Sequence, residues 1–505
     1  MHQSGFWSAV GLAVLLGPVA APAQTNETSD PAAVETIAAE DVTPQASAAA
    51  PGAIEAGPTP AAPDRAAAED AQCDRAELFG ATPPRGLEGT LEHIKNPVPW
   101  WKWGFDIRLR ETYIGNGFTL DKKDPDHEWH WQRQRVRLWG TLTPVENLDF
   151  NIRVAWEGKH FDRPLSFENW KPTSTVFDRL NVKWSDIAGT GVSIQAGRQE
   201  LMLGDRWLVM DGAPLVGSSF IYFDAIRLTF DLEAVDTTLD LVYLEQDAEE
   251  ENWFPPIDDE DRLLLEHDET GVIARLTNRS LPQTQLDGYF IYARRTPSAP
   301  NGDQAEIYTF GARAEHRFTD RLTLRGNLAG QFGRKNEAAL CALGGLSRLS
   351  YELEDGWKSA LRLDYEYLSG DRPGTERNEG FDILWGRWPR FSELYLYTYG
   401  GETRIGDYTN LHRVSLGWTG HPTEKLELCS DYHLLFADQT TFEELSGFSE
   451  SGCFRGQLFS TVARYRFTKH LSGHILGEYF FPGDYYTDER NDPAVFLRAE
   501  LVLSF

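Results

Sequence analysis

The sequence lacks long apolar runs, and this absence excludes a membrane protein built from helices. Mean hydropathy is −0.43, and the only unbroken apolar stretch of the 505 residues is 6–20, near the start. A helix needs about 20 consecutive, predominantly apolar residues to span a bilayer. Aromatic residues nevertheless make up 12% of the chain, with 16 tryptophans. The chain therefore has many amphipathic rings but little continuous apolar sequence.

Basic residues and cysteines are also few. The 48 lysines and arginines face 77 aspartates and glutamates, which gives a formal net charge of −29. A field of this sign repels phosphate, so we expect no nucleic-acid partner, although a local basic lining is still allowed. Of the four cysteines, only Cys429 and Cys453 are joined by a modest loop. Spacing alone does not establish disulfide geometry, so no bridge is predicted.

The start of the chain has the composition of an export signal. Residues 6–20 are mostly small and apolar and precede Ala21-Pro22-Ala23, a small-x-small cleavage site. We therefore predict a signal peptide at residues 1–23, although this stretch contains no lysine or arginine; the alternative is a short buried helix. The Ala- and Pro-rich residues 24–90 cannot bury enough apolar surface to offset their ordering entropy, which predicts a disordered periplasmic leader.

From residue 103 onward, apolar and charged residues alternate. In segment 103–110 every second residue is apolar, and Asp106 and Arg108 lie between them. Side chains of a β-strand point alternately to opposite faces, so this pattern predicts a strand with one apolar and one charged face. Segments 148–157 and 361–367 repeat the pattern.

The connections between these segments alternate in length, which distinguishes a membrane barrel from a soluble β-sandwich. Eight short turns are expected near 144–147, 186–189, 233–236, 280–283, 319–321, 354–356, 421–424 and 468–470. Nine long polar connections are expected at about 115–130, 158–175, 200–220, 247–268, 295–305, 334–341, 369–408, 438–453 and 482–493. Outer-membrane barrels combine short periplasmic turns, longer outer loops and an even number of strands.

These features predict an all-β fold, in which residues 91–505 form a transmembrane antiparallel β-barrel of about 18 strands, monomeric and in the outer membrane of a Gram-negative-type cell. The count is open by two, because residues 391–400 also read as a strand. The last stretch, 495–505, alternates and ends on Phe505, which resembles the signal read by the barrel assembly machinery. That machinery and outer-membrane lipid are the predicted partners of the barrel. Aromatic residues near strand ends, such as Trp184, predict girdles at the membrane interfaces.

A barrel of this width is too wide for its own side chains to fill, so the inward residues carry the function. The alternation places many arginines there, whose planar fork pairs carboxylates bidentately, and rings of arginine and lysine select anions in pores. The predicted substrate path consists of Arg108, Arg110, Arg133, Arg135, Arg137, Arg153, Arg179, Lys183, Arg198, Arg206, Arg227, Arg362, Arg464 and Arg466. The alternative is that each arginine pairs with an inward acid of a neighbouring strand and braces the wall.

Three segments resemble the alginate-export family of outer-membrane proteins. The first, 197–206, contains Gly-Arg-Gln-Glu-Leu followed by Gly-Asp-Arg and continues at 223–228. The others are the opening 95–110 and the Ser-Gly-Asp of 369–371. The resemblance covers roughly residues 90–505 and implies an eighteen-stranded barrel that exports an anionic polysaccharide through an arginine-lined constriction.

Members of this family have an inward loop that narrows the pore. The resemblance implies that the loop at 200–220 has this role here, and its polar residues make it the best candidate. The expected constriction residues are Gly197, Glu200, Gly204 and Asp205. Arg198 interrupts the alternation of the segment before it, which predicts a β-bulge near Gly197.

Three functions remain open at this point. The first is export of an anionic polysaccharide such as alginate, the second a general or anion-selective porin for sugars or small solutes, and the third a barrel enzyme. An enzyme would need a Ser–His or Asp–His constellation, but the 12 histidines are scattered and no Gly-x-Ser-x-Gly stretch occurs. We therefore predict no catalytic residue, no cofactor and no metal site. The acidic residues 258–261 are interpreted as a solvated loop rather than a calcium site.

Overall fold

The computed structural model describes residues 94–164, 171–210, 222–248, 257, 266–300, 302–387, 389–400, 402, 407–440 and 446–505. The predicted signal peptide and leader, at 1–23 and 24–90, and the acidic residues 258–261 lie outside the described residues.

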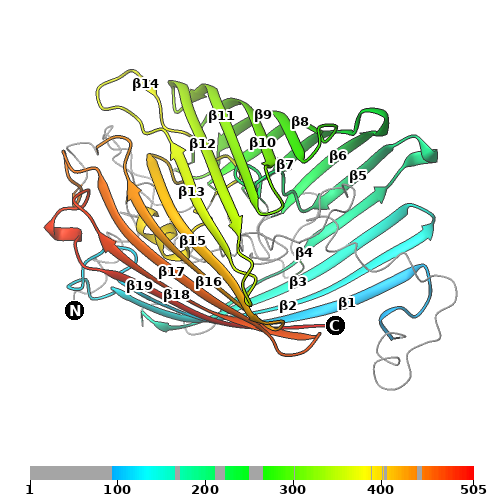
Figure 1. Ribbon diagram of the computed structural model, residues 1–505, viewed down its shortest axis with the longest axis horizontal. Coiled ribbons are helices and arrows are strands. Elements are labelled where there is room, and N and C mark those ends of the chain that lie inside the picture. Colours follow the sequence, from blue (N-terminus) through cyan, green and yellow to red (C-terminus); the bar gives the residue numbers. More distant parts are fainter. Residues whose placement is uncertain are drawn as a thin grey trace, which may run out of the picture.

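The described chain forms one closed antiparallel β-barrel (Figure 1). Its eighteen wall strands are β1 (Trp101–Gly115), β2 (Glu128–Val145), β3 (Leu148–Arg163), β4 (Lys171–Trp184), β5 (Val192–Gln199), β6 (Phe223–Leu232), β7 (Thr237–Gln246), β8 (His267–Asn278), β9 (Thr284–Pro297), β10 (Ala305–Arg317), β11 (Leu322–Lys335), β12 (Ala338–Glu352), β13 (Ala360–Leu368), β15 (Leu411–Thr423), β16 (Leu426–Phe436), β17 (Phe454–Arg466), β18 (Leu471–Pro482) and β19 (Ala494–Ser504). Pairing of β1 with β19 closes the barrel. The two-residue strand β14 (Arg377–Asn378) pairs parallel with β12 within a loop. The predicted barrel of about 18 strands is confirmed.

Short and long connections alternate around most of the barrel, and all eight predicted short turns join consecutive wall strands. The predicted long connection at 334–341 is wrong. There β11 ends at Lys335 and β12 begins at Ala338, so Asn336 and Glu337 alone make the turn. Both residues have positive φ, 46° and 72°, as a two-residue hairpin turn with the twist of the flanking strands requires.

Residues 391–400 contain a helix, α5 (Glu393–Gly400), and not a strand. The helix start is capped, because Ser392 Oγ accepts a hydrogen bond from the amide of Tyr395 over 2.9 Å. Tyr395 and Tyr397 are fully buried, as expected of a helix that is apolar all round and enclosed by the barrel. In the described part of the chain, the 3-10 helices η2 (Ile187–Gly189), η3 (Glu233–Val235) and η4 (Asp488–Arg490) lie in connections. Among the described residues, no helix is long and apolar enough to cross a membrane.

The outer face of the wall is apolar. Leu109, Leu138 and Ile475 are 51%, 53% and 66% exposed there, whereas the inward neighbour Arg108 is 0% exposed. Contiguous apolar surface of this extent is not left in water and fits a lipid environment. Trp184, at the end of β4, is exposed on the same face, as the predicted aromatic girdle requires.

The predicted bulge at Gly197 is not found. Gly197 pairs in register with Asn181 on β4 and with Ala225 on β6. Its φ is 113°, and the next residue, Arg198, is 1% exposed and ion-paired at 3.0 Å with Asp224 on the neighbouring strand β6. A Cβ at position 197 would lie 2.4 Å from the carbonyl oxygen of Leu180, so only glycine fits.

Cys341, Cys429 and Cys453 are free thiols, so the one cysteine pair considered from spacing forms no disulfide.

Candidate functional site

Two loops fold back into the barrel. The first inner loop is residues 200–210, which follow β5. The second inner loop lies between β14 and β15, is described at 379–387, 389–400 and 402, and carries α5, the yellow helix inside the barrel in Figure 1. Side chains alone do not fill a lumen of this width, and these two loops occupy part of it.

Backbone hydrogen bonds join the two inner loops. Val209 and Trp385 form a parallel β-bridge, and the amide of Trp385 donates to the carbonyl of Leu208 over 3.0 Å. Gly386 permits this approach, because a Cβ there would lie 1.9 Å from the carbonyl oxygen of Trp207. The loops therefore form one body inside the barrel.

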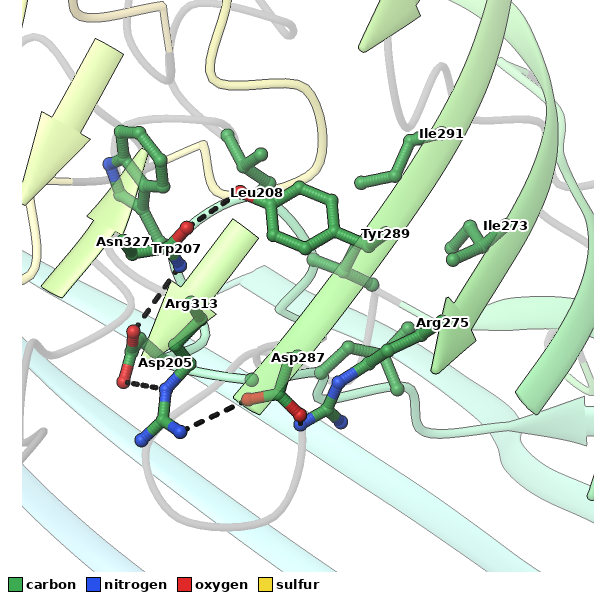
Figure 2. Close-up of a pocket in the computed structure, with 13 residues that line it drawn as sticks. Asp205, Trp207, Leu208, Ile273, Arg275, Asp287, Tyr289, Ile291, Arg313 and Asn327 are labelled. Carbon is green, nitrogen blue, oxygen red and sulfur yellow. Dashed lines mark hydrogen bonds and ion pairs between the residues drawn. The ribbon is translucent and has the colours of Figure 1, made fainter. Parts of the chain in front are cut away.

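Asp205 anchors the first inner loop to β10 and β11 (Figure 2). Its carboxylate accepts hydrogen bonds from Arg313 Nε over 3.0 Å and from Asn327 Nδ2 over 3.3 Å. Arg325 Nε lies 3.1 Å from the same carboxylate. Burial alone would raise the pKa of Asp205, but the surrounding guanidinium groups, first that of Arg325, outweigh burial and hold this pKa below its ordinary value. The anchor is thus an ionised carboxylate.

Asp382 anchors the second inner loop on the same side of the barrel. It accepts two hydrogen bonds from Arg295 on β9, over 2.6 and 2.9 Å, and one from Lys335 on β11 over 2.9 Å. Its amide donates to Gln331 Oε1 over 2.8 Å. Burial opposes ionisation of Asp382, but Arg295 and Lys335 prevail and hold its pKa well below the ordinary value.

The other end of the second inner loop is attached across the lumen. Ser392 Oγ and the amide of Leu394 donate to Glu478 on β18, over 2.9 and 2.7 Å. Past α5, Glu402 accepts a hydrogen bond from Arg455 Nη2 on β17 over 2.8 Å. The loop therefore spans from the β9–β11 wall to the β17–β18 wall.

Half of the predicted arginine path is buried rather than open to the lumen. Arg108, Arg110, Arg133, Arg135, Arg137, Arg153 and Arg198 are each at most 8% exposed. Glu157 illustrates their environment, because it accepts hydrogen bonds from Arg108 over 2.9 Å and from Arg133 over 2.6 Å. Arg110 donates to Glu500 over 2.7 Å in the same way. This geometry is that of wall bracing, and contact of these seven with a substrate stays a prediction.

The predicted constriction residues lie at the root of the first inner loop. Glu200 pairs with Arg153 and, over 2.6 Å, with Arg179. Gly204 and Arg206 take left-handed conformations, both with φ of 57°, and turn the loop around Asp205. The structure therefore places Glu200, Gly204 and Asp205 on one inward loop and Gly197 in β5 just before it, while their role as a constriction remains a prediction.

Among the described residues, several inward arginines remain partly exposed in the half of the lumen that faces the short turns, and five of them have a close acidic partner. They are Arg179, Arg227, Arg325, Arg348 and Arg464, with 21–29% of each side chain exposed. Each lies within five residues of the short-turn end of its strand. We call these five the lower ring. Each also has an acidic partner within 3.1 Å, which holds its guanidinium group in place.

Three other path residues lie elsewhere. Arg362 is buried against Asp431 at 2.9 Å, Lys183 is half-buried near the end of β4, and Arg466 is exposed at the end of β17. Arg295, Arg313 and Arg348 were missed by the sequence prediction. Arg313 and Arg348 follow the alternation of their strands and were detectable, whereas the position of Arg295 was assigned to a loop.

A pocket of about 400 Å³ lies between the first inner loop and strands β8–β11 (Figure 2). Its apolar lining includes Leu203, Trp207, Leu208, Val209, Ile273 and Ile291. Beside these, Asp287 is paired with Arg275 at 3.0 Å and with Arg313 at 3.1 Å.

The sequence profile of the family described as alginate export matches residues 103–497. Among solved structures, OccK5 (OpdH) of Pseudomonas aeruginosa is similar with a TM-score of 0.50 and 13% identity, over 80% of this chain and 98% of that one. OpdQ of the same organism gives a TM-score of 0.50 and 12% identity, over 80% and 97%. At these identities the likeness concerns the fold alone. No curated protein matches the chain.

Proposed function

Since the chain belongs to the alginate export family, it is an outer-membrane pore, and we propose that it exports an anionic polysaccharide of the alginate type. Such a polymer carries one carboxylate on each sugar. The transport path is proposed to run past the lower ring and then along the inner loops. The predicted arginines deeper in the wall hold that path open and give it a positive potential.

The lower ring is the observation that carries this proposal. A guanidinium group offers planar paired donors that match a carboxylate, and each ring member keeps part of its side chain exposed to the lumen. Every member also has an acidic neighbour that competes with a passing carboxylate. Transport requires binding that is favourable enough to enter and weak enough to leave, and such competition weakens binding at each position.

The experiment is planar-bilayer recording with a polyuronate added on the short-turn side. We expect the polymer to block the ion current at concentrations where the uronic acid monomer does not. The triple variant Arg179→Ala/Arg227→Ala/Arg464→Ala should lose at least tenfold in apparent affinity for the blocking polymer and shift ion preference toward cations. Arg294→Ala, which removes an exposed arginine on the outer face of β9, is the matched control and should leave both quantities unchanged.

A porin for small anions or sugars is the competing function. It would give the same ion current, but uronic acid monomer and polyuronate would then block that current at similar concentrations. Equal block by wild type and the triple variant would remove the lower ring from the path.

We also propose that the last strand is read by the barrel assembly machinery and that the barrel works as a monomer in outer-membrane lipid. The amide of Phe505 donates to the carbonyl of Phe105 over 2.9 Å, and the two rings stack at 5.4 Å. The terminal residue therefore lies at the seam of β19 and β1, the last pairing that closes the barrel. Residues 1–23 and 24–90 are proposed as the signal peptide and periplasmic leader.

A further inference from the structure

Three chemically reactive side chains meet on the outer face of the barrel, at the long-loop end of β1–β3. They are Glu111 on β1, His130 on β2 and Asp162 on β3. Their outward position follows from the alternation, because the neighbouring Arg110 and Trp131 are buried on the inward side. On β1, Leu109 is the exposed apolar residue next to the cluster, and Glu111 follows it in the direction of the long loop.

The imidazole of His130 faces a carboxylate on each side. Its Nε2 lies 2.5 Å from Glu111 Oε1, and its Nδ1 lies 3.2 Å from Asp162 Oδ2. A neutral imidazole has one N–H and cannot donate to both oxygens. Both ring nitrogens are therefore within reach of a carboxylate oxygen, and either one can be the nitrogen ligand of an ion held by the two carboxylates.

The backbone places Asp162 in this cluster. His130 is opposite Arg163 and Trp131 is opposite Phe161, so Asp162 is the extra residue of a β-bulge. A bulge re-aims the side chain that it carries. The second carboxylate oxygen of Asp162 is held by His160, whose Nε2 lies 3.3 Å away. Outer partners of this kind orient the carboxylates of metal sites.

We propose that Glu111, His130 and Asp162 bind a divalent transition-metal ion of the zinc class. The three ligand atoms lie within 4.8 Å of one another. One imidazole nitrogen and two carboxylate oxygens leave a fourth position for water, which suits a four-coordinate ion. Calcium prefers six to eight oxygen ligands and would find three protein groups, one of them nitrogen. The ion joins three adjacent strands at the outer rim.

The test is titration of the full-length, untagged protein in detergent with zinc alone, by calorimetry, and with cobalt(II), whose visible spectrum reports its ligands. We expect one tight site per barrel, and at least tenfold weaker binding in His130→Asn and in Asp162→Asn. His412→Asn is the matched control, because that imidazole contacts a single carboxylate, Asp438 at 3.2 Å. Control and wild type should bind alike.

Absence of saturable zinc binding by the wild type would overturn the proposal, as would equal affinity in wild type and His130→Asn. Displacement of zinc by an equal concentration of calcium would overturn the assignment to the zinc class. If one variant fails to fold, as judged by its heat-modified migration on gels, Glu111→Gln replaces it with the same expected loss.

Discussion

At the scale of single residues, the inward wall is organised by carboxylates that each serve several arginines. Glu157 is fully buried between Arg108 and Arg133, while the ion pair of Glu427 and Arg464 is only partly buried, with 21% and 27% of the side chains exposed. Breaking a buried pair leaves an uncompensated charge, whereas an exposed pair contributes little. The same substitution should therefore have very different effects at the two positions.

We predict that Glu157→Gln lowers the free energy of unfolding by about 3–5 kcal/mol, because two guanidinium groups lose their common anion. Glu427→Gln should cost about 0–1 kcal/mol. Guanidinium-induced unfolding of the reconstituted barrel, followed by tryptophan fluorescence, measures both. Similar midpoints for the two variants would contradict the bracing role of Glu157.

The arginine positions were predictable from the sequence, but their partners were not. Alternation places Arg110 on the inward face, yet its acceptor Glu500 is 390 residues away and becomes a neighbour only when β1 meets β19. The exposure of each arginine to the lumen also depends on contacts between elements that are distant in the sequence. The burial of seven path residues therefore had no signal in the local sequence.

At the scale of elements, the strands were predictable because each has one face in lipid and the other in the lumen. The segment at 391–400 has the same period of two, and a strand was one interpretation of it. In the structure it is enclosed on all sides. Its alternation therefore does not separate a lipid-facing side from a lumen-facing side. The cap at Ser392 selects the helix. The turn at Asn336 and Glu337 was missed because neither residue is glycine, although both take positive φ.

The attachment of the first inner loop should depend on the ionisation of Asp205. Because the pKa of Asp205 in the folded protein is below its ordinary value of about 3.9, the stabilisation is complete above that value and is lost as pH falls through the lower, folded-state value. We expect constant single-channel conductance from pH 8 to about 5 and a rise only below about pH 4. Asp205→Asn should show the raised conductance already at pH 7.

Asp492→Asn is the control for that measurement, since Asp492 pairs with Lys122 at 3.2 Å in an outer connection. It should keep the wild-type pH profile. A conductance of Asp205→Asn equal to wild type at pH 7 would show that this carboxylate does not hold the loop.

At the scale of the whole molecule, an acidic chain encloses a lumen whose wall carries arginines and carboxylates in close pairs. The net charge of −29 argued against a nucleic-acid partner but allowed a local basic lining, and the fold places many arginines on the inner face of the wall. The closed sheet separates these surfaces, with an apolar band outside and charges inside. The second inner loop is attached to opposite walls of the barrel, and the first inner loop is joined to it inside the lumen. We propose that this arrangement selects a long, regularly charged chain.

The most direct test of that claim is release of a labelled polyuronate from liposomes that contain the purified barrel. We predict that wild-type protein releases the polymer, that Arg179→Ala/Arg227→Ala/Arg464→Ala slows release at least tenfold, and that a neutral polysaccharide of equal length is retained by both. Retention of the polyuronate by wild-type liposomes that freely release small sugars would contradict the account and leave a porin for small solutes.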